Sequence, residues 1–318
     1  MTDKVFYLFP GQGAQFPGMA LDLLESGSER VKRLFSLSSE IFGKDMADLI
    51  RNSSPEDLKP TDIAQPGITL ANLAAAAYLA EKGIKPVGAA GFSLGEYSAL
   101  AATGIISEED CLVLVTKRGR AMQAAIDKIN QNDSRPPGMA AVIGLSPEKI
   151  EELIAEWGIA DLNAANINSP KQVAVSGSAD ALEEAEKRFK EAGARRFMRL
   201  AVAGPYHSPF MKSAAEEFDA ALEKVKFNDP AIPFFSNVTG KKVNGGAEAK
   251  ALAHRQILEG VRWTDEEAAI AMLKPEALFE VGPGKVLQGL WKDTENAIPC
   301  YGAGTLAEID ALSKQETV

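Results

Sequence analysis

The chain has 318 residues, of which 46% are hydrophobic and 25% charged, and a formal net charge of −10. This composition is typical of a globular protein with one large domain or two unequal ones. The acidic balance argues against nucleic-acid binding, because phosphate contacts need clustered Lys and Arg. The longest apolar run, residues 70–80, is too short to cross a bilayer, and no signal-like segment opens the sequence. We therefore expect a cytoplasmic protein without membrane or nucleic-acid partners.

The first 131 residues alternate between strand and helix patterns. Short apolar runs at 5–9 and 86–90 predict buried strands. A helix is expected from Pro66, placed in its first turn, to about residue 83. Two more helices are expected at 94–103 and 107–129. Such alternation predicts an α/β fold with a parallel sheet and helices on both faces.

A different pattern follows the Asn-, Asp-, Ser- and Pro-rich segment 132–138. Strand, helix, strand, strand, helix and strand patterns follow one another between 139 and 200, with Ser146 and Ser178 as expected helix caps. This βαββαβ order is that of a ferredoxin-like module. We therefore expect a small inserted domain at 132–200 and a large domain formed by 1–131 and 201–318.

The large domain is expected to resume after residue 200 with elements that complete its fold. A helix is predicted over 209–225, and strands are predicted at 232–236, at 277–281 and near Ile298, with two further helices between the first two strands.

A serine between two glycines, Gly91-Phe92-Ser93-Leu94-Gly95, separates a predicted strand from a predicted helix. In that context a Gly-x-Ser-x-Gly turn, called a nucleophile elbow, lifts a nucleophilic hydroxyl clear of a sheet. The main-chain N–H of Leu94, at the helix start, would point toward an oxyanion formed there. A plain glycine-rich turn is the alternative interpretation.

The chain has only two histidines as candidates for a catalytic base. His207 lies in a loop at the return from the small domain, where it can face a cleft between domains. His254 lies in a polar helical segment and is expected at the surface. Beside an elbow serine, His207 is the better candidate for a base, although a structural histidine is the alternative.

Arg118 is predicted to lie on the core side of its helix. The apolar face of that helix contains Leu114, Met122 and Ile126, and spacings of three or four residues place Arg118 among them. A guanidinium buried there needs an anionic partner. This partner would be either a substrate carboxylate, which the nearby elbow favours, or an acidic side chain of the protein.

The loop Phe9-Pro10-Gly11-Gln12-Gly13-Ala14-Gln15 follows the first strand. It fails as a dinucleotide-binding fingerprint, because Phe16 stands where the third glycine belongs. Its backbone N–H groups can supply the second half of an oxyanion hole, or the loop is only a structural turn. Cys111 and Cys300 lack metal-ligand spacing. We expect no metal and no bound cofactor.

Five segments together resemble those of malonyl-CoA:acyl carrier protein transacylases of type II fatty acid synthesis, in order and in spacing. They are Phe9–Gln15, Gly91–Tyr97, Arg118–Gln123, Asn168–Val173 and His207–Met211. The resemblance runs from the first strand nearly to the C-terminus. It implies an α/β-hydrolase-like core with a parallel sheet and the ferredoxin-like insert already expected.

The resemblance also implies a role for each candidate residue. Ser93 would attack the malonyl thioester with His207 as general base, and acyl carrier protein would then cleave the malonyl-serine ester in a ping-pong reaction. Arg118 would bind the free carboxylate of the malonyl group. The remaining implied roles are the oxyanion hole for the N–H groups of Gln12 and Leu94, orientation of the histidine by the main-chain carbonyl of Gln256, and lining of the pocket by Gln65.

The partners implied are malonyl-CoA and acyl carrier protein, and a monomer is expected. Phe92 departs from the family, which usually has histidine before the nucleophile. Tyr206, before the base, stands where family members vary with acyl chain, and its bulk favours malonyl over branched groups. Basic residues of the small domain are a candidate docking surface for the acidic carrier protein, or else a solvated face. They are Lys187, Lys190, Arg195 and Arg196.

Two other classes of function remain open from the sequence. A serine thioesterase or esterase would use the same elbow, with one of several Asp residues between Ser93 and His207 as a third catalytic member. A hydrolase of this kind has no need of a buried arginine at position 118. A non-catalytic acyl-binding module would not need the serine hydroxyl at all.

Overall fold

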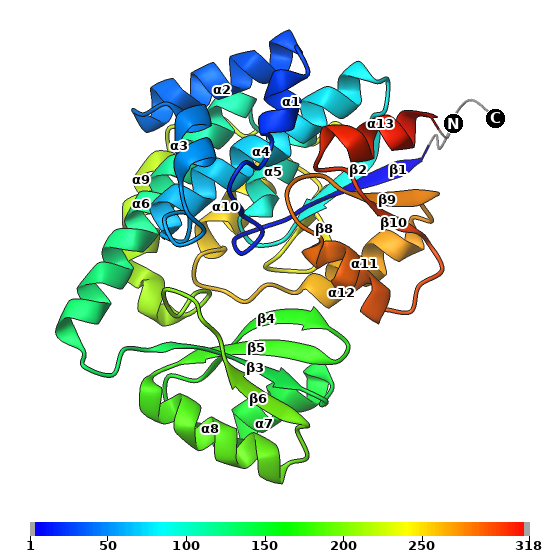
Figure 1. Cartoon of the computed structure of the whole chain (residues 1–318). Helices are drawn as coiled ribbons and strands as arrows, with labels where there is room; N and C mark the ends of the chain where they lie inside the picture. The colour runs from blue at the N-terminus through cyan, green and yellow to red at the C-terminus, as the bar shows by residue number, and fades with distance from the viewer. Residues whose placement is uncertain (1–3, 315–318) are drawn as a thin grey trace.

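The computed structural model describes residues 4–314, so the outermost ends of the predicted large domain lie outside the described residues. The elements between 138 and 199 form a small lobe, seen at the bottom of Figure 1, and the other elements form a larger lobe above it. The chain crosses between the lobes twice, after residue 132 and after residue 199.

A four-stranded parallel sheet forms the centre of the large lobe. Its order is β10-β9-β1-β2, and its strands are β1 Val5–Phe9, β2 Pro86–Gly91, β9 Ala277–Glu280 and β10 Cys300–Gly302. Every residue of β1 is buried, as expected for a parallel strand covered on both faces. The predicted α/β class with a parallel sheet is confirmed.

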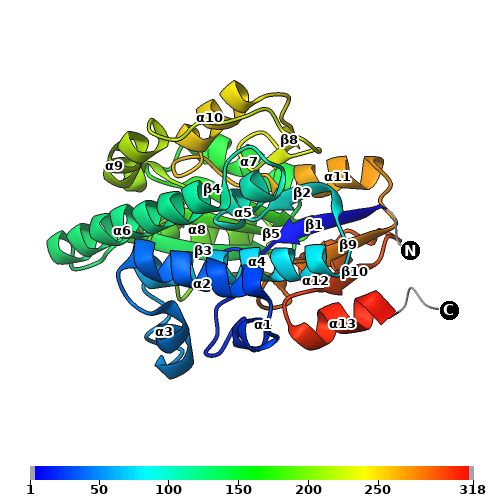
Figure 2. The same cartoon turned by 90° about the horizontal axis from the view of Figure 1, so that it is seen from above.

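The side chains of β1 alternate between two apolar cores. Tyr7 and Phe9 pack in the core shared with α4 Thr61–Glu81, α5 Gly95–Ala102 and α6 Glu108–Asn132. Phe6 and Leu8 pack in the core shared with α11 Trp263–Met272 and α12 Val286–Asp293. Figure 1 shows α4 above the strands of this sheet and α11 and α12 below them, and Figure 2 shows the four strands side by side in their order. The remaining helices of the described large lobe are α1 Leu21–Glu25, α2 Glu29–Phe42, α3 Met46–Asn52, α9 Lys212–Leu222, α10 Gly246–Arg255 and α13 Leu306–Lys314.

The small lobe is an antiparallel sheet covered by two helices on one face. Its strands pair in the order β4-β5-β3-β6. In chain order its elements are β3 Gly138–Ile143, α7 Pro147–Trp157, β4 Asn163–Ser169, β5 Gln172–Gly177, α8 Ala179–Glu191 and β6 Arg196–Arg199. The hydroxyls of Ser146 and Ser178 cap α7 and α8, as predicted. The uncovered face carries Met139, Ala165 and Ala174 and is turned toward Tyr206 of the large lobe.

The predicted start of α4 at Pro66 is wrong, because this helix begins at Thr61. The carbonyl of Pro60 accepts the first hydrogen bonds, from the N–H groups of Ile63 and Ala64, and the N–H of Thr61 donates to Gln123 Oε1 at 2.8 Å. Pro66 therefore lies inside the helix, where it lacks a donor for the fourth preceding carbonyl. By length and composition α4 could cross a membrane, but most of it is buried inside the protein.

Two expectations for the second half of the large lobe also need correction. The segment 232–236 is not a full strand of the central sheet: only β7 Phe235–Ser236 is a strand, and it pairs with β8 Lys241–Lys242. The segment lies beside β2, where the N–H of Ala89 donates to the carbonyl of Pro233 at 2.9 Å, but Pro233 has no N–H to continue a ladder. The helix predicted at 209–225 begins as a 3-10 turn, Pro209–Met211, before α9.

Candidate active site

Ser93 lies in a sharp turn between β2 and α5, with a φ of +50° that non-glycine residues rarely adopt. The flanking glycines are required by close backbone contacts. A Cβ at Gly91 would lie 2.0 Å from the carbonyl oxygen of Gly95, and a Cβ at Gly95 would lie 2.0 Å from that of Phe9. The local structure is thus the strained elbow that the sequence predicted.

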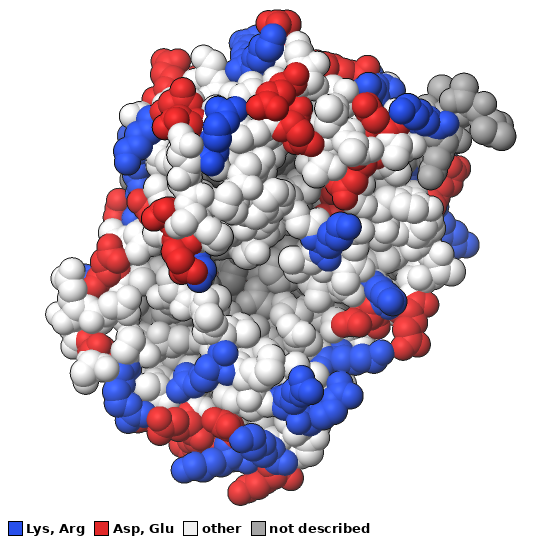
Figure 3. Space-filling view, viewed as in Figure 1, with Lys and Arg blue, Asp and Glu red and all other residues white. Residues whose placement is uncertain are grey.

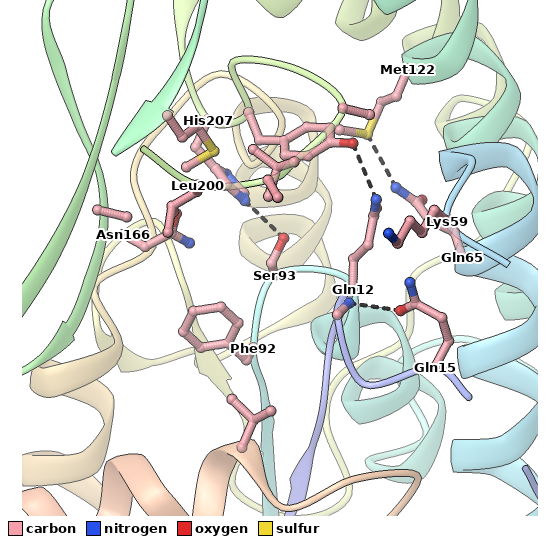
Figure 4. A pocket seen from close by; sticks show the side chains of 18 of the residues that line it. Gln12, Gln15, Lys59, Gln65, Phe92, Ser93, Met122, Asn166, Leu200 and His207 are labelled. Carbon is pink, nitrogen blue, oxygen red and sulfur yellow. Dashed lines mark hydrogen bonds between the residues drawn. The ribbon is translucent and has the colours of Figure 1, made fainter. Parts of the chain in front are cut away.

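His207 faces Ser93, with Nε2 2.8 Å from the serine Oγ (Figure 4). The other ring nitrogen, Nδ1, lies 2.9 Å from the carbonyl oxygen of Gln256 and 3.0 Å from that of Glu259. Carbonyl oxygens only accept hydrogen bonds, so Nδ1 carries the proton and Nε2 of the neutral ring accepts from the serine hydroxyl. Two main-chain carbonyls therefore hold the imidazole in the orientation and tautomer that a base needs.

The charge state of His207 also suits a base. Burial, and then the positive charge of Arg118, lower the pKa of His207 to about 4, against the opposing effect of the two carbonyls. The ring is therefore neutral at pH 7. No carboxylate among residues 4–314 contacts the ring, so the aspartate expected for a serine hydrolase triad is not part of this arrangement.

As predicted, Arg118 lies on the buried face of α6 and is 1% exposed, whereas its neighbours Lys117 and Arg120 are exposed. Its Nη2 donates to Gln256 Oε1 at 3.0 Å, and its guanidinium lies 5.5 Å from the centre of the Tyr97 ring. No carboxylate of the described chain forms an ion pair with it, so the internal salt bridge weighed as the alternative is not formed. A buried cation of this kind favours an anionic ligand.

The candidate oxyanion hole lies where the first loop meets the elbow. Neither the N–H of Gln12 nor that of Leu94 donates to another described residue. The two backbones approach closely, since a Cβ at Gly11 would lie 2.3 Å from the carbonyl oxygen of Phe92 and 3.5 Å from the nitrogen of Leu94. Both N–H groups therefore remain able to bind an oxyanion beside Ser93.

Both lobes line one cavity of about 810 Å³ around Ser93. Arg118 and Gln65 line it from the large lobe, and Asn166 and Gln172 line it from the small lobe. Figure 3 shows the corresponding hollow in the middle of the face, between the two lobes. The cavity therefore places an anion-binding group and a nucleophile in reach of one small ligand.

The polar side chains of the cavity wall bind one another. Gln65 Nε2 lies 3.3 Å from the sulfur of Met122, and Gln12 Nε2 donates to the hydroxyls of Tyr206 and Thr61, at 3.1 and 3.2 Å. In Figure 4, Gln12 and Gln65 lie on the side of the cavity away from His207.

Phe92, which occupies the position of the family histidine, turns partly into the apolar core. Its ring packs edge-on against Trp263, with ring centres 5.4 Å apart. Its own contacts are thus apolar, and the polar support that a histidine would give at this position is absent from the elbow.

Several residues of the site were not predicted from the sequence. The Glu259 carbonyl contacts the ring of His207, and the Tyr97 ring lies beside the guanidinium of Arg118. Asn166 lines the cavity from the small lobe. The Asn168–Val173 segment was quoted only for the family resemblance, and two of its residues, Asn168 and Gln172, line the cavity. A main-chain carbonyl has no residue type, so the sequence held no signal for Glu259.

Comparisons with known proteins show the family to which this chain belongs. Residues 6–308 match the acyl transferase domain family. The chain therefore belongs to that family.

Several of the similar proteins carry names that describe malonyl transferases of acyl carrier protein. The malonyl CoA-acyl carrier protein transacylase of Haemophilus influenzae is 37% identical over 98% of both chains. The structure of an acyl carrier protein S-malonyltransferase from Vibrio cholerae has a TM-score of 0.89 at 36% identity and covers 97% of this chain and 99% of its own. A malonyl-transacylase solved with its type II PKS acyl-carrier protein has a TM-score of 0.89 at 33% identity, over 98% and 99%.

Proposed function

We propose that this protein moves a malonyl group from coenzyme A to the phosphopantetheine thiol of acyl carrier protein, through a malonyl-serine ester on Ser93. The observation that carries the proposal is the presence, in one cavity, of a serine–histidine pair and a buried arginine with which no carboxylate of the described chain forms an ion pair. A thioester with a free carboxylate fits both groups at once. The names of the similar proteins support the same activity.

In the first half-reaction, the Ser93 oxygen attacks the thioester carbonyl carbon while its proton passes to Nε2 of His207. The carbonyl oxygen becomes an oxyanion, which the N–H groups of Gln12 and Leu94 stabilise. The carbon–sulfur bond then breaks, and the imidazolium returns its proton to the leaving sulfur of coenzyme A. The Gln256 and Glu259 carbonyls stabilise the transient positive charge through Nδ1.

The second half-reaction reverses these roles with another thiol. His207 takes the proton of the phosphopantetheine thiol, the sulfur attacks the ester carbon, and the ester bond to Ser93 breaks as the proton returns to the serine oxygen. Ser93 and His207 are thus regenerated, and the balance needs no metal, oxidant or cofactor.

Binding of the malonyl carboxylate by Arg118 would set substrate choice. The guanidinium offers a planar pair of donors, which matches a carboxylate. The hydroxyl of Tyr206 is fixed by Gln12 and by Thr61, whose oxygen lies 2.7 Å away. Its ring therefore occupies part of the cavity, which favours malonyl over branched acyl groups.

The finer description of the fold follows the same proposal. The strand order β4-β5-β3-β6 supports classing the insert, 132–200, as ferredoxin-like, and the elbow after a parallel strand supports an α/β-hydrolase-like core in 1–131 and 201–318. We further propose that the enzyme is a cytoplasmic monomer that uses no bound cofactor.

Carrier docking is proposed at the basic cluster, defined as Lys187, Lys190, Arg195 and Arg196. All four side chains are exposed, although Lys190 also contacts Glu186 at 2.6 Å. Figure 3 shows Lys and Arg side chains spread over the small-lobe part of the face that holds the hollow. Positive charge there would attract an acidic carrier protein.

Intact-protein mass after brief exposure to malonyl-CoA alone tests the function. A transacylase should gain the mass of one malonyl group and lose it when acyl carrier protein is added, while Ser93→Ala should gain nothing. Steady release of malonate without an acceptor would instead indicate a thioesterase. Activity retained in Ser93→Ala would contradict a serine mechanism.

A further inference from the structure

A buried polar cluster lies outside the cavity, around Asn237 in the loop after β7. Asn237 is fully buried, and its side-chain amide donates to the carbonyl of Gly91 at 2.8 Å and to Glu266 Oε1 at 2.7 Å. Its main-chain N–H donates to Glu96 Oε2 at 2.8 Å. Glu96 belongs to the first turn of α5 and Glu266 to α11, so one asparagine joins the elbow to two helices.

Gln256 connects Asn237 to the three groups of the proposed mechanism. Its Nε2 donates to the carbonyl of Ser93 at 2.6 Å and lies 3.3 Å from Asn237 Oδ1. The same residue accepts from Arg118 through its side chain and from His207 through its main-chain carbonyl. Asn237 is therefore hydrogen-bonded to Gln256, the residue that contacts Ser93, Arg118 and His207.

The two carbonyls held by this cluster are those on either side of the strained turn. Asn237 binds the carbonyl of Gly91, and Gln256 binds that of Ser93 itself. A serine with a φ of +50° persists only where its surroundings fix the backbone on both sides. The cluster supplies that fixation without contributing a side chain to the cavity lining.

We infer that Asn237 is a positioning residue, which fixes the Ser93 turn relative to the Gln256 side chain. Glu96 and Glu266 are the hydrogen-bond acceptors that hold Asn237 in place. This inference rests on the proposed function, since it assigns a task in the acylation of Ser93.

The two acids make the cluster costly to bury. Glu96 is 3% exposed and Glu266 is fully buried. Burial raises the pKa of Glu96 to about 8, against the lowering effects of Asn237 and Arg118, and burial together with Glu96 raises the pKa of Glu266 well above its usual range. A neutral acid at position 266 still offers a carbonyl oxygen to Asn237, and so would glutamine. A geometric role is consistent with this cost, because satisfied buried polar networks fix unique arrangements.

The rate of Ser93 acylation by malonyl-CoA, followed by rapid quench and intact mass, tests the inference. Asn237→Ala should acylate about 100-fold more slowly at saturating malonyl-CoA, with KM changed less than about threefold, because a small displacement of the nucleophile costs about that factor. Glu266→Ala should be slowed about 10-fold, and Glu266→Gln should restore the wild-type rate.

Glu267→Ala is the matched control. Glu267 is the next residue of α11, is 1% exposed, and accepts from Trp263 Nε1 at 2.9 Å, and it forms no hydrogen bond with residues 91–95 or with Asn237 in the described chain. It should lose stability but keep its acylation rate within about twofold, so a merely structural effect is separated from positioning.

Equal acylation rates in wild type and Asn237→Ala would overturn the inference alone. A wild type that gains no malonyl group would overturn the proposed function and the inference with it. Should Asn237→Ala fail to fold, the Glu266 pair decides, and equal losses in Glu266→Gln, Glu266→Ala and Glu267→Ala would reject the positioning role.

Discussion

At the scale of single residues, the base and the buried cation affect one another. Arg118 lowers the pKa of His207 in addition to the effect of burial, which keeps the ring neutral down to about pH 4. A base is active in its neutral form, so acylation should lose rate only as the pH falls toward 4. This places the acidic limb of the pH profile below the ordinary histidine value of about 6.5.

Arg118→Met should move that limb to higher pH. The substitution removes a positive charge near the ring while filling most of the buried volume, so protonation of His207 becomes less costly and its pKa rises. Single-turnover acylation by acetyl-CoA, measured from pH 4 to 8, gives the limb without needing a carboxylate on the substrate. Lys117→Met, on the exposed side of the same helix, should leave the limb in place. A limb that does not move in Arg118→Met would contradict the coupling.

Arg118 should also determine which acyl group is transferred. Arg118→Ala should lower kcat/KM for malonyl-CoA by about 100-fold or more, because the malonyl carboxylate loses a buried, charge-assisted partner. Acetyl transfer should fall much less, so selectivity shifts toward uncharged groups. Parallel assays with malonyl-CoA and acetyl-CoA give the ratio, with Lys117→Ala as the control. An unchanged malonyl to acetyl ratio would remove Arg118 as the carboxylate anchor.

At the scale of elements, the site depends on close contact between the β1–α1 loop and the elbow. Gly11→Ala places a methyl group 2.3 Å from the carbonyl oxygen of Phe92, so the loop must move and carry the Gln12 N–H away from the oxyanion position. Acylation should slow by about 100-fold, as expected when one oxyanion donor is lost. Rapid-quench mass measurements with malonyl-CoA provide the rate.

Gly289→Ala serves as the comparison for that prediction. A Cβ added at Gly289, inside α12, meets nothing within 4 Å, so alanine fits there without a clash. It should keep the wild-type rate and gain up to about 1 kcal/mol of stability, since alanine favours helix. If both glycine variants acylate as fast as wild type, the close approach does not position Gln12.

Elements defined by local chemistry were predictable from the sequence. Ser107, Ser146 and Ser178 each cap the helix expected to follow them, because a serine hydroxyl and the N–H three residues on are neighbours in any such turn. The start of α4 was not predictable, since the N–H of Thr61 is satisfied by Gln123 of another helix. Its hydrogen bond depends on packing between helices far apart in sequence.

The residues of the site also separate into those that the local sequence predicts and those that depend on long-range packing. Ser93 was predicted from the turn that its flanking glycines form, and Arg118 from the face of its helix, so both follow from local geometry. Asn237 and Glu259 act through contacts with residues more than 50 positions away, at Gly91 and His207. Such contacts exist only once α10, α11 and β2 have packed. No motif in the sequence around Asn237 or Glu259 indicates them.

At the scale of the whole molecule, the two lobes contribute different kinds of residue to the cavity. The large lobe carries Ser93, His207 and Arg118 on elements anchored in the central sheet and its helices, while the small lobe supplies one uncharged wall with Asn166 and Ala174. The reacting groups are therefore fixed by the larger apolar core. The exposed surface of the small lobe is left free to vary in charge without disturbing them.

That separation allows carrier docking to be tested apart from chemistry. Lys187→Glu with Arg196→Glu reverses two exposed charges on the small lobe for which no ion pair is formed within residues 4–314. The KM for acyl carrier protein should rise about 10-fold at low salt and less at high salt, while the KM for malonyl-CoA stays unchanged. Lys44→Glu, an exposed charge of the large lobe, is the control. Equal effects on both substrates would show that the basic cluster is a solvated face and not the docking surface.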